Sequence, residues 1–257
     1  MSDERKQAVQ AQFGRQASHY SVSEVHRESA GLAELLRLAA PFSGARALDI
    51  ATGTGFTALA MAPRCRRVIG LDLTLGMVEE ARRLAGERGT SNVGFCLGDA
   101  EAVPFCDHAF EIVTCRFAAH HFPNLSRAFS EMARVATPGG GVIIEDTCAP
   151  EAPHLATLMN EWELRRDPSH VQDLPPSRLR AMMGQSGLTV EAATLTTVPQ
   201  EFDSWTRRAG VLVEQTAALR AGFLDAGSDA RAAFQIEEGG GSLRFVWPAV
   251  VILAVKR

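Results

Sequence analysis

The sequence contains 257 residues, of which 46% are hydrophobic and 22% are charged, and its formal net charge at pH 7 is −4. This size suffices for one large α/β domain with insertions, and the weak negative charge argues against a nucleic-acid-binding protein with a basic surface. No apolar run reaches the roughly 20 residues of a membrane span, the N-terminal segment lacks the apolar core of a signal peptide, and the 5 cysteines form no C-x-x-C pair, so we expect a cytoplasmic protein.

The first 40 residues have the apolar periodicity of two helices, the second of which ends before Pro41. From about residue 45 to residue 150, short apolar strands alternate with amphipathic helices. The strands expected in this part are 46–51, 67–73, 92–100, 110–117 and 138–147. Nearly continuous apolar strands that are joined by helices predict a parallel sheet with both faces covered.

The second half of the chain follows a looser pattern. The elements expected there are a helix with proline-rich ends before residue 175, a helix at 177–187, a strand at 188–197, a helical stretch at 203–235 and a last strand. Pro248 in the last strand favours a strand end or a sheet edge, because proline has no N–H to donate. The segments at about 148–175 and 200–238 interrupt the regular alternation, and we interpret them as helical cap insertions over a binding cleft.

Several side chains of these insertions have two interpretations. Trp162, Phe202 and Trp205 either line an acceptor pocket or pack within the cap, and packing is the interpretation that we favour. His154 and His170 either contact a substrate or belong to an exposed helix end with ion pairs.

The stretch ALDIATGTGFTA at 47–58 places Gly53 and Gly55 between a strand and a helix. Its G-x-G-x-x-A spacing is typical of a dinucleotide-binding loop, because glycines let a ligand approach the backbone and a helix N-terminus favours an anion. Asp72 ends the next strand, where an acid that binds ribose hydroxyls is expected, and a solvated strand end is the alternative. Together these features predict an adenosine-like cofactor.

Two further carboxylates distinguish between adenosine-like cofactors. Asp49 precedes the loop, where it would repel the pyrophosphate of a dinucleotide but complement the ammonium group of S-adenosylmethionine. Asp99 follows the third strand, where it can accept a hydrogen bond from the adenine amine beside the backbone N–H of Ala100. Bracing of the loop by Asp49 and helix capping by Asp99 are the structural alternatives. The set favours S-adenosylmethionine over a nicotinamide dinucleotide.

Four segments resemble a known family, namely ALDIATGTG, GLDLTLGMVEEA, NVGFCLGDAEAVPFCDHAFEIVTCRFAAHHF and EMARVATPGGGVIIED. In this order they resemble the motifs of class I S-adenosylmethionine-dependent methyltransferases, and most of all those of the ubiquinone/menaquinone C-methyltransferase-like (methyltransferase type 11) group. The resemblance extends over residues 13–147, and Ala51 departs from the glycine that the family usually has there. It implies a Rossmann-like sheet of seven mostly parallel strands, with helices on both faces and an antiparallel last strand at 244–257.

The resemblance also implies the residues of the cofactor site. The methionine end of the cofactor would be held by Asp49, Ala51, Gly53 and Gly55. The ribose and the adenine would be bound by Asp72, Leu73, Met77, Asp99 and Ala100. The remaining contacts would come from Arg116 and Phe117 beneath the cofactor and from Tyr20, which would close over it from the lid-like stretch FGRQASHY.

Two adjacent histidines follow the fourth strand, on the rim toward which a transferred methyl group would point. An imidazole with its ordinary pKa of about 6.5 suits a general base, so His121 and His120 are candidate catalytic residues. Adjacent helical residues face different directions, so we expect at most one of them in the site and favour His121. No third ligand follows at a recognisable metal-site spacing, so we predict no metal. A structural role in holding backbone groups is the alternative.

We therefore expect a helical lid at 1–40, a cofactor-binding core at 41–147, and a remainder at 148–257 that completes the sheet and contains the cap insertions. The expected reaction is C- or O-methylation of a small aromatic or phenolic acceptor, with S-adenosyl-L-homocysteine as the product. The alternatives are an S-adenosylmethionine-dependent catalyst that transfers no methyl group, a non-catalytic binding module, and a NAD-dependent oxidoreductase, which Asp49 disfavours. The sequence leaves the acceptor and a homodimer open.

Overall fold

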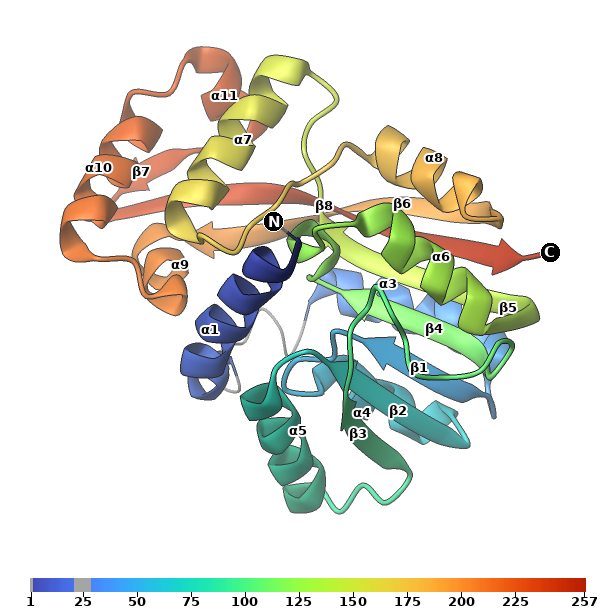
Figure 1. The fold of residues 1–257 in the computed structure, drawn as a ribbon. Coiled ribbons are helices and arrows are strands. Elements are labelled where there is room, and N and C mark those ends of the chain that lie inside the picture. Colours follow the sequence, from blue (N-terminus) through green and yellow to red (C-terminus); the bar gives the residue numbers. More distant parts are fainter. Residues whose placement is uncertain (1, 21–28) are drawn as a thin grey trace.

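The computed structural model of the chain describes residues 2–20 and 29–257, with the side chains of residues 4–14 and 29–257. Its centre is a sheet in which the strands follow the order β3-β2-β1-β4-β5-β8-β6 (Figure 1). Their bounds are β1 Arg46–Ile50, β2 Arg67–Asp72, β3 Val93–Leu97, β4 Phe110–Arg116, β5 Ala136–Thr147, β6 Leu188–Glu201 and β8 Ser242–Lys256. A short strand, β7 (Glu237–Gly239), pairs with β8 outside this order.

The direction of the strands confirms the predicted fold class. Strands β1 to β5 pair in parallel, and β8 is antiparallel to both β5 and β6. This is the expected Rossmann-like sheet of seven strands with an antiparallel last strand, to which β7 adds a short hairpin strand. The strand order reverses between β1 and β4, and ligands of open parallel sheets bind at such a switch point.

Helices cover both faces of the sheet, as the near-continuous apolar strands predict (Figure 1). One face is covered by α3 (Ala30–Ala39), α4 (Phe56–Met61) and α5 (Leu75–Glu87). The other face is covered by α6 (Leu125–Val135) and α8 (Pro176–Gln185). The remaining short turns are η1 (Ala40–Phe42), η2 (Ala62–Arg64) and η3 (Ala119–His121).

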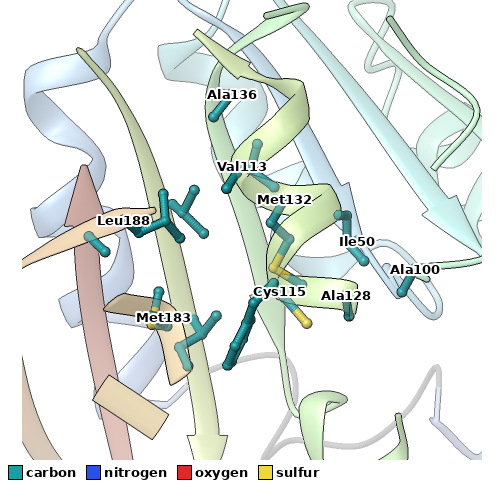
Figure 2. Packing of buried hydrophobic residues seen from close by; sticks show 14 of the residues in the cluster. Ile50, Ala100, Val113, Cys115, Ala128, Met132, Ala136, Met183 and Leu188 are labelled. Carbon is teal, nitrogen blue, oxygen red and sulfur yellow. The ribbon is translucent and has the colours of Figure 1, made fainter. Parts of the chain in front are cut away.

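Helix α6 shows how the sequence pattern produces one of these faces. It begins at Asn124, whose side-chain oxygen accepts a hydrogen bond from the backbone N–H of Arg127 at 3.0 Å. Its apolar positions recur at helical spacing, and Phe129 and Met132 are completely buried against the sheet. In Figure 2, Met132 lies next to Val113 and Cys115 of β4, within the same cluster of buried side chains.

The insertions predicted at 148–175 and 200–238 form a third apolar cluster beside the ends of β6 and β8 (Figure 1). Their helices are α7 (Pro153–Arg166), α9 (Phe202–Ala209), α10 (Val213–Leu224) and α11 (Ser228–Ala233). The cluster is built on aromatic side chains, which are Trp162, Phe202, Trp205, Phe223, Phe234, Phe245 and Trp247. The helices are where they were expected, and their role as a cap stays a prediction.

Pro248 lies inside β8, not at a strand end or a sheet edge as its missing N–H predicted. Its carbonyl oxygen accepts a hydrogen bond from the backbone N–H of Cys148 at 2.9 Å. The last residue of β5 that pairs with β8 is Thr147, opposite Ala249, so the β5 ladder ends next to the proline. Pro248 is also paired with Thr197 of β6, but its carbonyl faces Cys148, so its nitrogen faces the β5 side as well, beyond the last paired residue, and no ladder bond to β6 is lost.

The N-terminal part consists of α1 (Ser2–Tyr20), which packs against α5 and α9, followed by α3. Two helices were expected here, and the lid role of residues 1–40 stays a prediction. Within residues 2–20 and 29–257, no helix combines the length and the apolar character that crossing a bilayer requires.

Replacing Phe129 by alanine should destabilise the fold by about 3–5 kcal/mol, because the ring is completely buried between α6 and the sheet. Urea unfolding of the purified protein measures this change. The matched control is Leu195→Ala in β6, where the side chain is 71% exposed and the expected change is below about 0.5 kcal/mol. Equal effects of the two substitutions would contradict the packing described here.

Candidate functional site

A cavity, here called the first cavity, opens at the carboxyl ends of the parallel strands and encloses about 1030 Å³ of space that is open to solvent at its mouth. The fold brings most of the predicted site residues to its wall, namely Ala51, Gly53, Asp72, Leu73, Met77, Asp99, Ala100, Arg116, Phe117 and His121. These residues come from the ends of four strands and from the helix that follows β2, which is the arrangement that the motif order predicts.

The loop after β1 contains left-handed backbone conformations, which residues other than glycine rarely adopt. Gly53 and Gly55 have φ angles of +54° and +86°, and Gly55 ends the loop at the start of α4. Gly55 does not line the first cavity, and a Cβ there would lie 2.9 Å from the ring of Phe95. Ala51 has a φ of +51°, so this alanine keeps the left-handed conformation that a glycine adopts more readily.

Asp49 braces this loop from behind. Its carboxylate accepts hydrogen bonds from the hydroxyls of Thr52 at 2.6 Å and Thr114 at 2.7 Å. It is 2% exposed and does not line the first cavity, and burial raises its pKa to about 6 although the hydroxyls lower it. The structure thus supports the bracing alternative, and an interaction of Asp49 with a cofactor ammonium group through water stays a prediction.

Asp72 lies on the wall of the first cavity and holds the other side of the loop. Its two carboxylate oxygens accept hydrogen bonds from the backbone N–H groups of Gly53 and Thr74, each at 2.8 Å. Burial raises the pKa of Asp72, and these backbone bonds oppose that shift. Each oxygen can accept further bonds, so the carboxylate suits a pair of ribose hydroxyls.

Asp99 forms an ion pair with a residue of α1 that was not predicted from the sequence. The ammonium group of Lys6 lies 2.7 Å from the Asp99 carboxylate and 2.6 Å from that of Glu101. Asp99 also accepts a hydrogen bond from the backbone N–H of Glu101 at 2.8 Å, so it caps a turn and not a helix. Lys6, Val9 and Phe13 place α1 along the first cavity, and no local pattern in α1 indicated this position.

Arg116 and Phe117 lie on the wall of the first cavity, after β4. The Arg116 guanidinium donates a hydrogen bond to the hydroxyl of Thr57 at 2.9 Å, lies 3.7 Å from a carboxylate oxygen of Glu145, and stacks 5.0 Å from the centre of the Phe117 ring. Burial lowers the pKa of Arg116 and raises that of Glu145 to about 7. Tyr20 is the last residue of α1, and its side chain lies outside the described residues.

A second cavity of about 550 Å³ adjoins the first, and Phe13, Phe117 and His121 line both. Its other apolar walls are Val198, Trp205 and Trp247. Its polar walls are His120, Thr147, Glu163, Arg166, Gln200 and Arg208. Most of these residues belong to the predicted cap insertions or to the strands beside them. Trp205 therefore packs in the aromatic cluster, as favoured, and also lines a cavity.

Glu163 of α7 fixes the aromatic wall of the second cavity. One of its carboxylate oxygens accepts hydrogen bonds from the indole N–H groups of Trp205 and Trp247. The other oxygen accepts a hydrogen bond from the guanidinium of Arg166 at 3.2 Å. Three side chains, from α9, β8 and α7 itself, are thus held by a single buried carboxylate.

The two adjacent histidines both line the second cavity, and His121 also lines the first. They lie in η3 with ring centres 4.2 Å apart, and which of them faces a reacting acceptor stays a prediction. Nδ1 of His120 lies 2.6 Å from the Asp146 carboxylate, and Nδ1 of His121 lies 3.2 Å from the carbonyl oxygen of Ser169.

These surroundings shift the pKa values of the two imidazoles in opposite directions. Burial disfavours the charged form of His120, but the negative charge and the hydrogen bond of Asp146 outweigh it and raise the pKa to about 9. Burial and the neighbouring His120 lower the pKa of His121 to about 4. His170 is also buried, with Nε2 at 2.9 Å from the side-chain oxygen of Asn160, so the exposed helix end expected for it is wrong.

The chain is similar in sequence to a known protein family and to several of its members. Residues 48–144 match the family described as "Methyltransferase domain". The chain is 36% identical to the uncharacterized methyltransferase YcgJ of Bacillus subtilis, over 95% of this chain and 98% of that protein. It is 35% identical to a demethylmenaquinone methyltransferase of Thermus thermophilus, over 59% of this chain and 77% of that protein.

Two solved structures share the whole fold. The crystal structure of Bacillus subtilis YcgJ superposes with a TM-score of 0.84 and covers 88% of this chain and 98% of that one, at 36% identity. A putative methyltransferase from Bacillus halodurans superposes with a TM-score of 0.85 and covers 89% of this chain and 99% of that one, at 33% identity.

Replacing Gly55 by alanine should destabilise the protein by about 2–4 kcal/mol, because the left-handed backbone is unfavourable for alanine and the new Cβ would meet the Phe95 ring at 2.9 Å. Thermal or urea unfolding measures this. Gly86→Ala in α5 is the control, since nothing lies within 4 Å of a Cβ there and alanine favours the helix. If Gly55→Ala were as stable as Gly86→Ala, the loop conformation would be different from the one described.

Proposed function

The chain belongs to the class I S-adenosylmethionine-dependent methyltransferases, and we propose that it methylates a small molecule that binds in the second cavity. The observation that carries this proposal is the junction of the two cavities. Phe13, Phe117 and His121 line both, so a ligand of the first cavity and a ligand of the second would meet at these side chains.

The described residues of the first cavity fit S-adenosyl-L-methionine. The backbone N–H groups of the loop and of the first turn of α4 would bind the carboxylate of its methionine part. Asp72 would accept the ribose hydroxyls, and Leu73 and Met77 would flank the adenine. Asp99 would accept the adenine amine, which requires that it share its carboxylate with Lys6.

When bound, S-adenosyl-L-methionine supplies a methyl group on a sulfonium, which is already a strong electrophile. The protein therefore has to align the acceptor and to exclude water. Phe13 and Phe117 would hold the two ligands in line at the junction, and the apolar side chains of the second cavity would favour a transition state in which charge is dispersed. His121 lies at the junction, and because its pKa is lowered to about 4 it is unprotonated at neutral pH and would accept, as a weak base, the proton that the acceptor releases.

An aromatic or phenolic acceptor is supported by the walls of the second cavity. Trp205, Trp247 and Phe117 are among its lining residues, and aromatic walls favour a planar, aromatic ligand. The Thermus thermophilus relative is named for the methylation of demethylmenaquinone, which agrees with such an acceptor. C- and O-methylation both fit a proton acceptor at the position of His121.

Calorimetry should detect binding of S-adenosyl-L-methionine and S-adenosyl-L-homocysteine to the purified protein, with NAD as the negative control. Asp72→Asn should weaken this binding about 10- to 100-fold, because it removes a charged acceptor from the ribose hydroxyls. The matched control is Asp107→Asn, since that carboxylate is 63% exposed and lies outside the first cavity. Unchanged affinity in Asp72→Asn would refute the ribose assignment, and binding of NAD alone would refute the proposed function.

With an acceptor found by screening phenols and quinols with methyl-labelled S-adenosyl-L-methionine, His121→Gln should lower kcat about 10²- to 10⁴-fold. Its affinity for S-adenosyl-L-methionine should stay within a few-fold of the unmodified protein. His154→Gln serves as the control, because this histidine is 66% exposed and contacts neither cavity. Full turnover of His121→Gln would show that proton acceptance by this imidazole is not needed.

A further inference from the structure

We propose that His120, Asp146 and Asp173 bind one divalent transition-metal ion beside the second cavity, whose wall includes His120. Each of the three residues offers one ligand atom, and these atoms all lie within 4.8 Å of one another. They come from η3, from the end of β5, and from the segment between α7 and α8. No metal was expected because the three residues are not at a short spacing in the sequence, whereas the fold gathers them from distant parts of the chain.

Several charged groups are buried together here. Asp146 and Asp173 are each 1% exposed, and Glu163 and Asp167 are buried as well. The His120 imidazole lies 2.6 Å from Asp146 and the Arg166 guanidinium is engaged by Glu163, so neither of these two groups is left to compensate Asp173. Carboxylates removed from water are costly unless a cation or hydrogen-bond donors compensate them, and a divalent ion would compensate two of them at once.

Asp173 has a buried carboxylate oxygen that receives no hydrogen bond from the described residues. One carboxylate oxygen of Asp173 accepts a hydrogen bond from the hydroxyl of Thr147 at 2.6 Å. The other is buried and has no hydrogen-bond partner among the described residues, although it belongs to the group of three ligands. Buried oxygens of this kind are rare in native proteins and call for a ligand.

Hydrogen bonds hold the proposed ligands in place. The backbone N–H of Asp173 donates to the side-chain oxygen of Asn160 at 2.7 Å, and that oxygen also lies 2.9 Å from Nε2 of His170. Asp146 accepts a hydrogen bond from the backbone N–H of His120 at 3.0 Å, which does not involve the imidazole. The two aspartates are thus positioned by backbone hydrogen bonds, and supporting bonds of this kind are usual around metal sites in proteins.

The donor set indicates the class of ion. One imidazole and two carboxylates favour Mn²⁺, Fe²⁺ or Zn²⁺ over Mg²⁺ and Ca²⁺, which prefer oxygen ligands alone. His120 and Thr147 line the second cavity, so the ion would face an acceptor bound there. The ion would bind and polarise an oxygen atom of the acceptor. This use of the ion rests on the proposed function, whereas the existence of the metal site does not depend on it.

Calorimetric titration of the full-length, chelator-treated protein with Mn²⁺ and with Zn²⁺ tests the site. We expect saturation at one ion per chain and at least tenfold weaker binding to Asp173→Asn, which keeps the size of the side chain. Asp229→Asn is the matched control, because Asp229 is a carboxylate that pairs with a histidine, His154, on the exposed surface. It should bind the ions like the unmodified protein.

The proposal is overturned if neither ion binds at one equivalent, or if Asp173→Asn binds them as tightly as the unmodified protein does. Circular dichroism of Asp173→Asn establishes that the variant is folded. Titration of the same metal-free samples with S-adenosyl-L-methionine reports separately on the proposed function, because no proposed ligand of the ion lines the first cavity.

Discussion

Two buried carboxylates that hold one loop determine where every other part of the site can lie. Asp49 holds the loop from behind through the hydroxyls of Thr52 and Thr114, and Asp72 holds its front through the backbone N–H of Gly53. Asp49 thereby connects β1 to β4, and Asp72 connects the loop to the start of α5. The left-handed residues of the loop, Ala51 and Gly53 among them, are kept in place by these bonds at the wall of the first cavity.

The parallel sheet and the carboxylates at its strand ends could be predicted because both depend on local patterns. Apolar strands alternate with amphipathic helices, and parallel topology then brings Asp72 and Asp99 to one edge. The contact of Lys6 with Asp99 could not be predicted, because it joins α1 to a turn 93 residues away. The close approach of the two histidine rings could not be predicted for a similar reason, since the conformation of η3 depends on Asp146 and on the segment after α7.

The two cavities have different structural origins. The first is formed mainly by the parallel core and its loops, which is the part that matches the methyltransferase family over residues 48–144. The second is formed largely by α7, α9 and the ends of β6 and β8, which pack around an aromatic cluster of their own. The proposed cofactor site and the proposed acceptor site would therefore depend on separate hydrophobic cores, and substitutions in one core need not disturb the other.

The carboxylate of Glu163 links these elements in a way that constrains how the second cavity can change. It holds Trp205 of α9, Trp247 of β8 and Arg166 of its own helix at the same time. A substitution at any one of these positions leaves a buried partner of the carboxylate or the carboxylate itself unsatisfied. During divergence, a new acceptor shape would therefore require several positions to change together, so this wall of the cavity is expected to evolve as a unit while single substitutions accumulate elsewhere.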